Sequence, residues 1–419
     1  MKKIIFPIAI TTLIFLQIIL VSCSSGNKVS EQTAIENEEK TPIEMRNNQF
    51  AFDIFKAINS SHDENLVISP FSISTALAMT YAGADGNTAE EMAQTLYFYS
   101  GQEKFHKDFS AWMNAIIEKG EVKDKLQVAN SLWPQEDYPF REDFVNLIKE
   151  YYESALFKVN YRGDREQIRQ RINTWVENHT NQLIRNLIKP GVLTDDTRLV
   201  LVNAIYFLSD WKIAFDEKVT HTAPFYITPK KPVNVPLMYM EDDLRYAETV
   251  DFQIIELEYE GGDFSMVAVL PAEDTNIDKF INEFDVVTFM QTLDIMEKKK
   301  VEVYLPSFKV RSNFDLEKLL AEMGMPEAFS NRADFGRMTD LQDLKIDKVI
   351  HEAFIDVNEE GTEAAASTAV VIIRKSAMVD PPEKTIFRAD RPFVYAIKDN
   401  STQSILFMGK TINPALKAD

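Results

Sequence analysis

A stretch near the carboxyl terminus, residues 359–373, limits most strongly what this chain can fold into. Gly361 provides a hinge, small residues fill positions 364–369, and a β-branched run follows at positions 370–373. Every second residue from Thr362 onward is uncharged, so the segment can enter a β-sheet with nothing large or charged on its inward face. Because alanine favours helices and β-branched residues favour strands, an ordinary buried strand or a helix is an open alternative.

The amino terminus indicates export. Lys2 and Lys3 precede an apolar stretch from Ile4 to Val21, and Cys23 follows directly after it and one serine. This order resembles a bacterial lipoprotein signal, which is cleaved before a cysteine that then carries lipid. We therefore expect residues 1–22 to be removed and Cys23 to be lipidated. A transmembrane anchor is the alternative, but the stretch is near the lower length limit for spanning and is interrupted by polar residues and proline.

The residues after the signal divide into a tether and a domain. Residues 23–46 hold the lipidated cysteine and a polar stretch without apolar periodicity, which favours a flexible tether. Residues 47–419 contain no second linker and are expected to form one domain. Lipid on Cys23 would attach the protein to a bacterial membrane without spanning it. We expect a location in the cell envelope, on the periplasmic face or at the cell surface.

Composition excludes several classes of function. The formal charge is −20, which argues against general binding of nucleic acid. With Cys23 as the only cysteine, no internal disulfide can form. The five histidines show no metal-ligand spacing, and no G-x-S-x-G elbow is present. We therefore expect neither an enzyme nor a metal site, and no cofactor.

Helical patterns dominate the first half of the chain. Apolar residues repeat at helix spacing from Phe50 to Ile58. Ser69 followed by proline predicts a helix start, Thr88 with Glu91 predicts a capping box, and Asp164 is expected to cap a further helix.

Strands dominate the second half. The predicted strands are 199–208, 252–259, 264–270, 301–305, 349–357 and 405–408. Strands and helices do not alternate regularly, which favours the α+β class.

Five segments in chain order carry a resemblance to a known family. They are residues 65–79, residues 201–207 followed by Trp211, residues 305–309, residues 387–394 and residues 405–410. Together with residues 359–373 they resemble the corresponding segments of the serpins, the loop-insertion protease inhibitors. The resemblance runs from about Asn47 to Pro414.

The resemblance implies a single α+β domain with a large central mixed β-sheet, further sheets, surrounding helices and an exposed reactive loop. In this family a protease cleaves the loop, whose amino-terminal part then inserts into the sheet. The protease is trapped as a covalent acyl-enzyme and is the expected partner. The chain would be a metastable monomer, and the apolar run at positions 370–373 makes loop–sheet polymerisation a hazard.

The family's spacing from the hinge residue Glu359 places the reactive bond at Lys375–Ser376. A basic residue there suits a trypsin-like protease. Arg374 is an alternative at the neighbouring bond, and counting back from Phe387 moves the bond toward Ala377 and Met378. An elastase-like or cysteine protease acting at a nearby bond is a further alternative.

The resemblance also assigns control positions. The hinge comprises Glu359, Gly361, Thr362, Ala364, Ala365 and Ala366, whose small residues fit the inhibitory type. The shutter beneath the sheet comprises Ser69, Ser72, Asn203 and His351, and the breach contains Trp211. Ser307 stands where many members carry a basic residue, so we expect Glu359 to be held less tightly. A non-inhibitory surface-binding lipoprotein is the remaining alternative.

Overall fold

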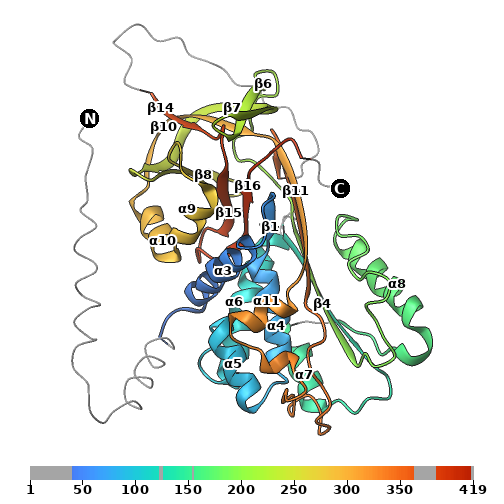
Figure 1. Ribbon diagram of the computed structural model, residues 1–419. Coiled ribbons are helices and arrows are strands. Elements are labelled where there is room, and N and C mark those ends of the chain that lie inside the picture. Colours follow the sequence, from blue (N-terminus) through green and yellow to red (C-terminus); the bar gives the residue numbers. More distant parts are fainter. Residues whose placement is uncertain (1–39, 122–125, 153–154, 363–383, 417–419) are drawn as a thin grey trace, which may run out of the picture. The chain divides into compact units, whose positions relative to one another are not determined.

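The computed structural model describes residues 40–121, 126–152, 155–362 and 384–416 (Figure 1). Ile43–Asp419 forms one compact unit, and Met1–Pro42 is separate from it. Within the described residues, no helix combines the length and apolar character needed to cross a membrane.

The helices lie mainly in the first half of the chain, as expected. Their bounds are α3 (Ile43–Asn59), α4 (Pro70–Tyr81), α5 (Gly86–Leu96), α6 (Gln102–Glu121), α7 (Glu142–Tyr152), α8 (Tyr161–His179), α9 (Ile277–Glu283), α10 (Val286–Ile295) and α11 (Glu317–Met323), with a short 3₁₀ turn at Glu327–Phe329. The predicted cap of α4 is confirmed, because the Ser69 hydroxyl accepts a hydrogen bond from the Ser72 N–H.

Two helix starts differ from the sequence prediction. Helix α3 begins at Ile43, ahead of the expected domain start at Asn47. Helix α5 begins at Gly86 rather than at a box headed by Thr88, because the Thr88 hydroxyl instead accepts from the Asp334 N–H. Helix α8 is kinked at Asp164, whose backbone is non-helical, and capping of the part that follows by this residue stays a prediction.

The described residues form three β-sheets besides these helices. A nine-stranded sheet has the order β1-β16-β15-β9-β8-β7-β10-β14, with β6 paired to β7. Its strands are β1 (Leu66–Ile68), β6 (His221–Thr228), β7 (Lys231–Glu248), β8 (Phe252–Glu258), β9 (Phe264–Pro271), β10 (Glu297–Pro306), β14 (Thr385–Arg388), β15 (Phe393–Asp399) and β16 (Ile405–Thr411). The β10–β14 pair is parallel and the other pairs are antiparallel, so the sheet is mixed.

The two smaller sheets lie next to each other, and the division between them runs between β12 of one and β4 of the other. One has the order β11-β12-β13-β5, built from β11 (Phe308–Asp315), β12 (Ile350–Val357), β13 (Gly361–Thr362) and β5 (Ser209–Asp210). The other has the order β3-β2-β4, built from β3 (Ala155–Leu156), β2 (Leu126–Pro134) and β4 (Leu199–Phe207). Strands and helices are not arranged in regular βαβ units, which confirms the α+β prediction.

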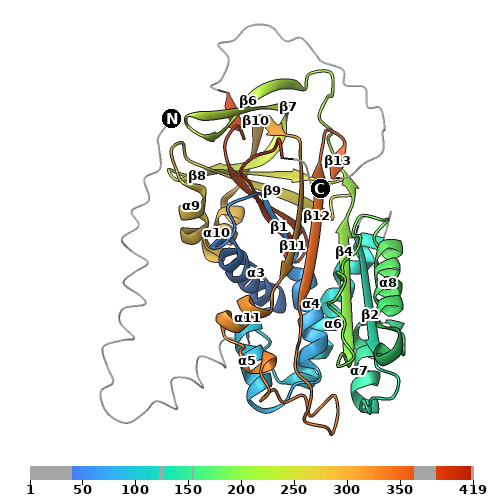
Figure 2. The ribbon, with the colours of Figure 1, turned by 45° about the vertical axis from the view of Figure 1, so that its right-hand side comes forward.

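The hydrophobic core lies between the sheets and helices α3 and α4. Strands β9, β15 and β16 are buried along their whole length. Helix α4 contacts both β16 and β4, and it therefore joins the large sheet to the small one. Strands β4 and β12 lie side by side, and α4 packs against β4 (Figure 2).

Strands β4 and β12 are neighbours that do not pair with each other in the described part of the chain. The edge of β12 that faces β4 is paired only at Val357, whose partner is Thr362 of β13. Strand β5 continues the line of β4 and pairs with the other edge of β13. The predicted hinge residues Gly361 and Thr362 therefore lie at one end of the division between the sheet of β12 and the sheet of β4.

Candidate functional site at the hinge

The hinge enters the sheet as the two-residue strand β13. Gly361 and Thr362 pair with Asp210 and Ser209 of β5, and Thr362 also pairs with Val357 of β12. Thr362 is only 1% exposed. The predicted hinge therefore contributes Gly361 and Thr362 to the sheet that contains β12 and β5.

Backbone hydrogen bonds hold the residues that precede β13. The Trp211 N–H donates to the Glu360 carbonyl at 2.7 Å, and the Phe215 N–H donates to the Glu359 carbonyl at 2.9 Å. The Asn358 side-chain oxygen accepts from the Glu360 N–H at 3.0 Å, which forms a tight turn before the strand. The hinge is thus tied on one side to the segment that follows β5.

Trp211, the residue expected in the breach, lies directly beneath the hinge. Its ring stacks on that of Tyr259 with centroids 4.5 Å apart and planes at 9°. Its indole N–H donates to the Asn358 carbonyl at 2.9 Å. The stacked pair therefore packs under the turn while the indole nitrogen holds the turn's backbone.

Tyr259 was not identified from the sequence, although its side chain contacts the predicted hinge directly. Its hydroxyl lies 2.7 Å from Oγ1 of Thr362, and both groups are buried. Burial raises the pKa of the Tyr259 hydroxyl well above its ordinary value. The residue stays neutral at physiological pH and provides a hydrogen bond rather than a charge. Its position two residues before Gly261 carries no signal for this contact.

Gly361 is required by a close approach of two backbones. A Cβ placed on it would lie 2.2 Å from the Ser209 carbonyl oxygen. A side chain at this position would force the hinge away from β5. The glycine therefore allows β13 to fit beside β5, in addition to the conformational freedom expected from the sequence.

Ser307, where the sequence departs from the family pattern, does not contact the hinge carboxylate. Its N–H donates to the Pro236 carbonyl at 3.1 Å. Within the described residues, no cationic side chain forms an ion pair with Glu359. Backbone bonds rather than a salt bridge hold Glu359. The expectation that Glu359 is held less tightly than in family members with a basic residue at the position of Ser307 stays a prediction.

Three of the four predicted shutter residues lie together beneath the sheets. Ser69 donates through its hydroxyl to the Leu406 carbonyl at 2.7 Å, and its N–H donates to Nε2 of His351 at 3.0 Å. The Ser72 N–H donates to the Ser69 hydroxyl at 3.2 Å. Asn203 lies in β4 opposite Asn130, and its side chain lies outside the described part. The shutter role itself stays a prediction.

His351 is neutral in this cluster. Burial lowers its pKa to about 3. Because the Ser69 N–H donates to Nε2, that nitrogen carries no proton, and a proton on it would remove the bond. The ring therefore joins β12 to the start of α4 only in its uncharged form.

The remaining predicted positions fall outside the described residues. They are Cys23, Ala364, Ala365, Ala366, Arg374, Lys375, Ser376, Ala377 and Met378. The reactive bond and the lipidation site are therefore predictions from the sequence.

Comparison with known proteins agrees with this architecture. A family model described as serpin (serine protease inhibitor) matches residues 45–414. A serpin-like protein of Methanosarcina acetivorans is 36% identical over 412 residues, covering 96% of each chain. The leukocyte elastase inhibitor of Sus scrofa is 37% identical over 381 residues, which cover 89% of this chain and 99% of the relative.

A solved structure gives the same result for the fold. The structure described as cleaved Serpin 42Da superposes with a TM-score of 0.80 at 32% identity, covering 90% of this chain and 99% of the other. With a family model spanning nearly the whole compact unit, relatives matched over most of their length and a shared fold, the chain belongs to the serpin family.

Proposed function

We propose that this protein inhibits a trypsin-like protease by inserting its cleaved reactive loop into the division between β12 and β4. Protease inhibition in general follows from the family and from its elastase-inhibitor relative. The observation that supports the insertion step is β13, which already occupies the top of that division.

The register of β13 predicts where the loop would go. Continuing the antiparallel pairing of Thr362 with Val357 would place Ala364 opposite Ile355 and Ala369 opposite Ile350 of β12. On the other side, continuing the pairing of β13 with β5 would bring residues 364–372 beside β4. The loop would thus pair with both strands in one unbroken register.

The direction of the Thr362 side chain supports insertion of this sequence. Thr362 faces the interior, where it meets Tyr259. Because side chains alternate along a strand, Ala364 and Ala366 would also face inward, whereas Glu363 would face solvent. No charge would enter the core along residues 362–372 on the inward side.

Insertion would release substantial free energy. Each new backbone hydrogen bond contributes about 0.5–1.5 kcal/mol net. A dozen or so such bonds, with burial of the β-branched side chains, amount to roughly 10 kcal/mol or more. This energy would move and distort a protease still joined to the loop as an acyl-enzyme.

Lys375–Ser376 is the proposed reactive bond, because the family's spacing from Glu359 places it there and a basic residue suits trypsin-like enzymes. We further propose that the protein acts in the bacterial cell envelope, held by lipid on Cys23. Both proposals rest on the sequence.

The test mixes the chain lacking residues 1–23 with trypsin and separates the products on a denaturing gel. This form keeps the whole compact unit. We expect an SDS-stable band at the summed mass and a released peptide that begins at Ser376. A Lys375→Ala variant should lose the trypsin complex, and an Arg374→Ala variant should keep it.

Two results would contradict the proposal in different ways. A complex whose released peptide begins elsewhere would keep the inhibitory mechanism and reject the assigned bond. Complete cleavage at Lys375 with fully active trypsin would make the chain a substrate, and the same gel with an elastase-like protease would then decide whether it inhibits at all.

A further inference from the structure

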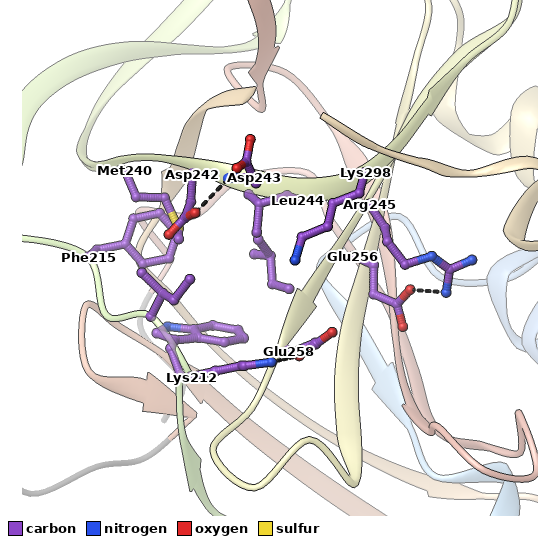
Figure 3. A pocket seen from close by; sticks show the side chains of 13 residues that line it. Lys212, Phe215, Met240, Asp242, Asp243, Leu244, Arg245, Glu256, Glu258 and Lys298 are labelled. Carbon is purple, nitrogen blue, oxygen red and sulfur yellow. Dashed lines mark hydrogen bonds and ion pairs between the residues drawn. The ribbon is translucent and has the colours of Figure 1, made fainter. Parts of the chain in front are cut away.

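A pocket with a volume of about 180 Å³ lies beside the breach, where β7 parts from β8 (Figure 3). The two strands pair only from Arg245 with Glu256 to Glu248 with Gln253. Beyond Glu256, strand β8 bonds instead to the segment after β5, since the Lys212 N–H donates to the Glu258 carbonyl at 2.9 Å. The pocket occupies the fork between this segment and β7.

The pocket has apolar walls. Trp211, Phe215 and Leu244 line it, and each is largely buried by the surrounding fold. Met240 and Leu257 add further apolar surface. A ligand with an aromatic ring or a short aliphatic chain would gain hydrophobic contact there.

Most charges around the pocket are already paired. Lys212 forms an ion pair with Glu258, and Arg245 forms one with Glu256 at 2.7 Å. Glu256 is also bonded at 2.7 Å to Lys398, which is 1% exposed. The two carboxylates and three cations in these pairs are therefore already occupied.

Lys298 differs from these residues. Its ammonium group points into the pocket in Figure 3, and no acidic side chain among the described residues forms an ion pair with it. Asp242 and Asp243 also line the pocket, and the Asp242 carboxylate accepts the Asp243 N–H. Lys298 is the lining cation that is directed into the pocket without an ion pair among the described residues.

We propose that the pocket binds a small amphipathic carboxylate, with its carboxylate at Lys298 and its apolar part against Trp211 and Phe215. The charge of Lys298 and the apolar walls select for a molecule that carries one negative charge at one end.

The pocket is connected to the hinge through two of its walls. The same Trp211 and Phe215 whose side chains line the pocket donate their backbone N–H groups to Glu360 and Glu359. A bound ligand would hold Trp211 and Phe215 in place. The hinge would then stay paired at Gly361 and Thr362, and further residues of the loop would enter the sheet more slowly. The consequence for inhibition, slower loop insertion, rests on the proposed function.

The first test uses three probes of the same size, namely 2-naphthoate, naphthalen-2-ylmethylammonium and naphthalen-2-ylmethanol. Binding to the chain lacking residues 1–23 is measured by saturation-transfer NMR. We expect 2-naphthoate to bind most tightly. Tighter binding of the ammonium probe would assign the polar end to Asp242 and Asp243 and overturn the proposal.

Two matched variants locate the site. Lys298→Met should weaken 2-naphthoate binding about threefold to tenfold, because one charged contact is lost. Lys300→Met, on the same strand and face, does not line the pocket and should bind as the original chain does. Equal binding by all three proteins would overturn the proposed site.

The coupling to the hinge is measured by hydrogen exchange with mass spectrometry. With 2-naphthoate present, we expect the amides of Trp211 and Phe215 to exchange about twofold or more slowly, and this protection to be absent in Lys298→Met. Binding without protection would overturn the coupling. Neither the binding measurement nor the hydrogen-exchange measurement needs a protease. A chain that fails to inhibit trypsin would therefore reject the proposed function, and both measurements would still test the pocket and its coupling to the hinge.

Discussion

The hydroxyl of Tyr259 and the Oγ1 of Thr362 lie 2.7 Å apart and are both buried, although 103 residues separate them along the chain. Tyr259 directly follows β8 of the large sheet, and Thr362 belongs to β13 in the predicted hinge. Their hydrogen bond therefore joins the predicted hinge to the end of β8.

Tyr259→Phe removes this bond and keeps the stacking on Trp211. The buried Thr362 hydroxyl would be left without its partner, so we expect the free energy of unfolding to fall by about 1–2 kcal/mol. Urea denaturation measures the change, with Tyr226→Phe at a 40% exposed position as the control. Equal stability of both variants would show that the hydroxyl does not hold the hinge.

A matched pair of arginine substitutions tests the direction of the hinge side chains. Thr362→Arg would place a charge in the interior beside Tyr259, so the loop should be cleaved without trapping the protease. Glu363→Arg alters the next residue, which would face solvent opposite Asp356, and this variant should still form the complex. Denaturing gels with trypsin distinguish the two, and complex formation by both variants would reject the proposed register.

His351 should make stability depend on pH. Its pKa falls from 6.5 in the unfolded chain to about 3 when folded, so the unfolded state binds more protons below neutral pH. Stability is therefore lost as the pH falls from about 6.5 toward 3. Between pH 7 and pH 5 this histidine accounts for a loss of about 2 kcal/mol.

The variant His351→Gln isolates this contribution, because glutamine does not titrate and its oxygen can accept the Ser69 N–H. Urea denaturation of both proteins at pH 7 and pH 5 gives the comparison. We expect the variant to lose about 2 kcal/mol less than the original chain. His106, also buried with its pKa lowered to about 3, is present in both proteins and cancels. Parallel pH profiles would contradict a neutral, buried His351.

Arg311 ties β11 to the segment after α8. It donates to the Leu183 carbonyl at 2.9 Å and to the buried carboxylate of Glu352 at 2.7 Å. Arg311→Met would leave that carboxylate buried with the neutral Asn313 amide as its donor, so we expect a loss of about 2–4 kcal/mol.

Adding Glu352→Gln to Arg311→Met should recover about half of that loss, since the unpaired charge is then removed. Lys318→Met, which breaks an ion pair on the surface, should change stability by less than about 0.5 kcal/mol. Urea denaturation measures all three. A double variant no more stable than Arg311→Met would show that the carboxylate was not the cause.

Local patterns in the sequence were sufficient for much of the fold. The apolar strand at 199–208 and the alternating strand at 301–305 appear as β4 and β10, because their side-chain pattern suits only burial in a sheet. The proline after Ser69 likewise determines where α4 begins. Thr88 was assigned wrongly because its hydroxyl has a partner, the Asp334 N–H, that is distant in sequence.

The order of the family's motifs predicted the hinge and the position of Trp211, and it placed Ser69 and His351, which are hydrogen-bonded, in one cluster. It did not identify Tyr259 or Phe215, since neither residue type nor spacing indicates a contact with a loop more than a hundred residues away.

The sequence by itself predicts a segment able to enter a sheet, because small and uncharged residues at alternate positions from Thr362 to Ile372 can be buried at little cost. Only the tertiary structure decided how far that loop has entered and what holds it. Gly361 fits against the Ser209 carbonyl, and Thr362 meets Tyr259. These contacts depend on the packing of separate strands, which no local pattern encodes.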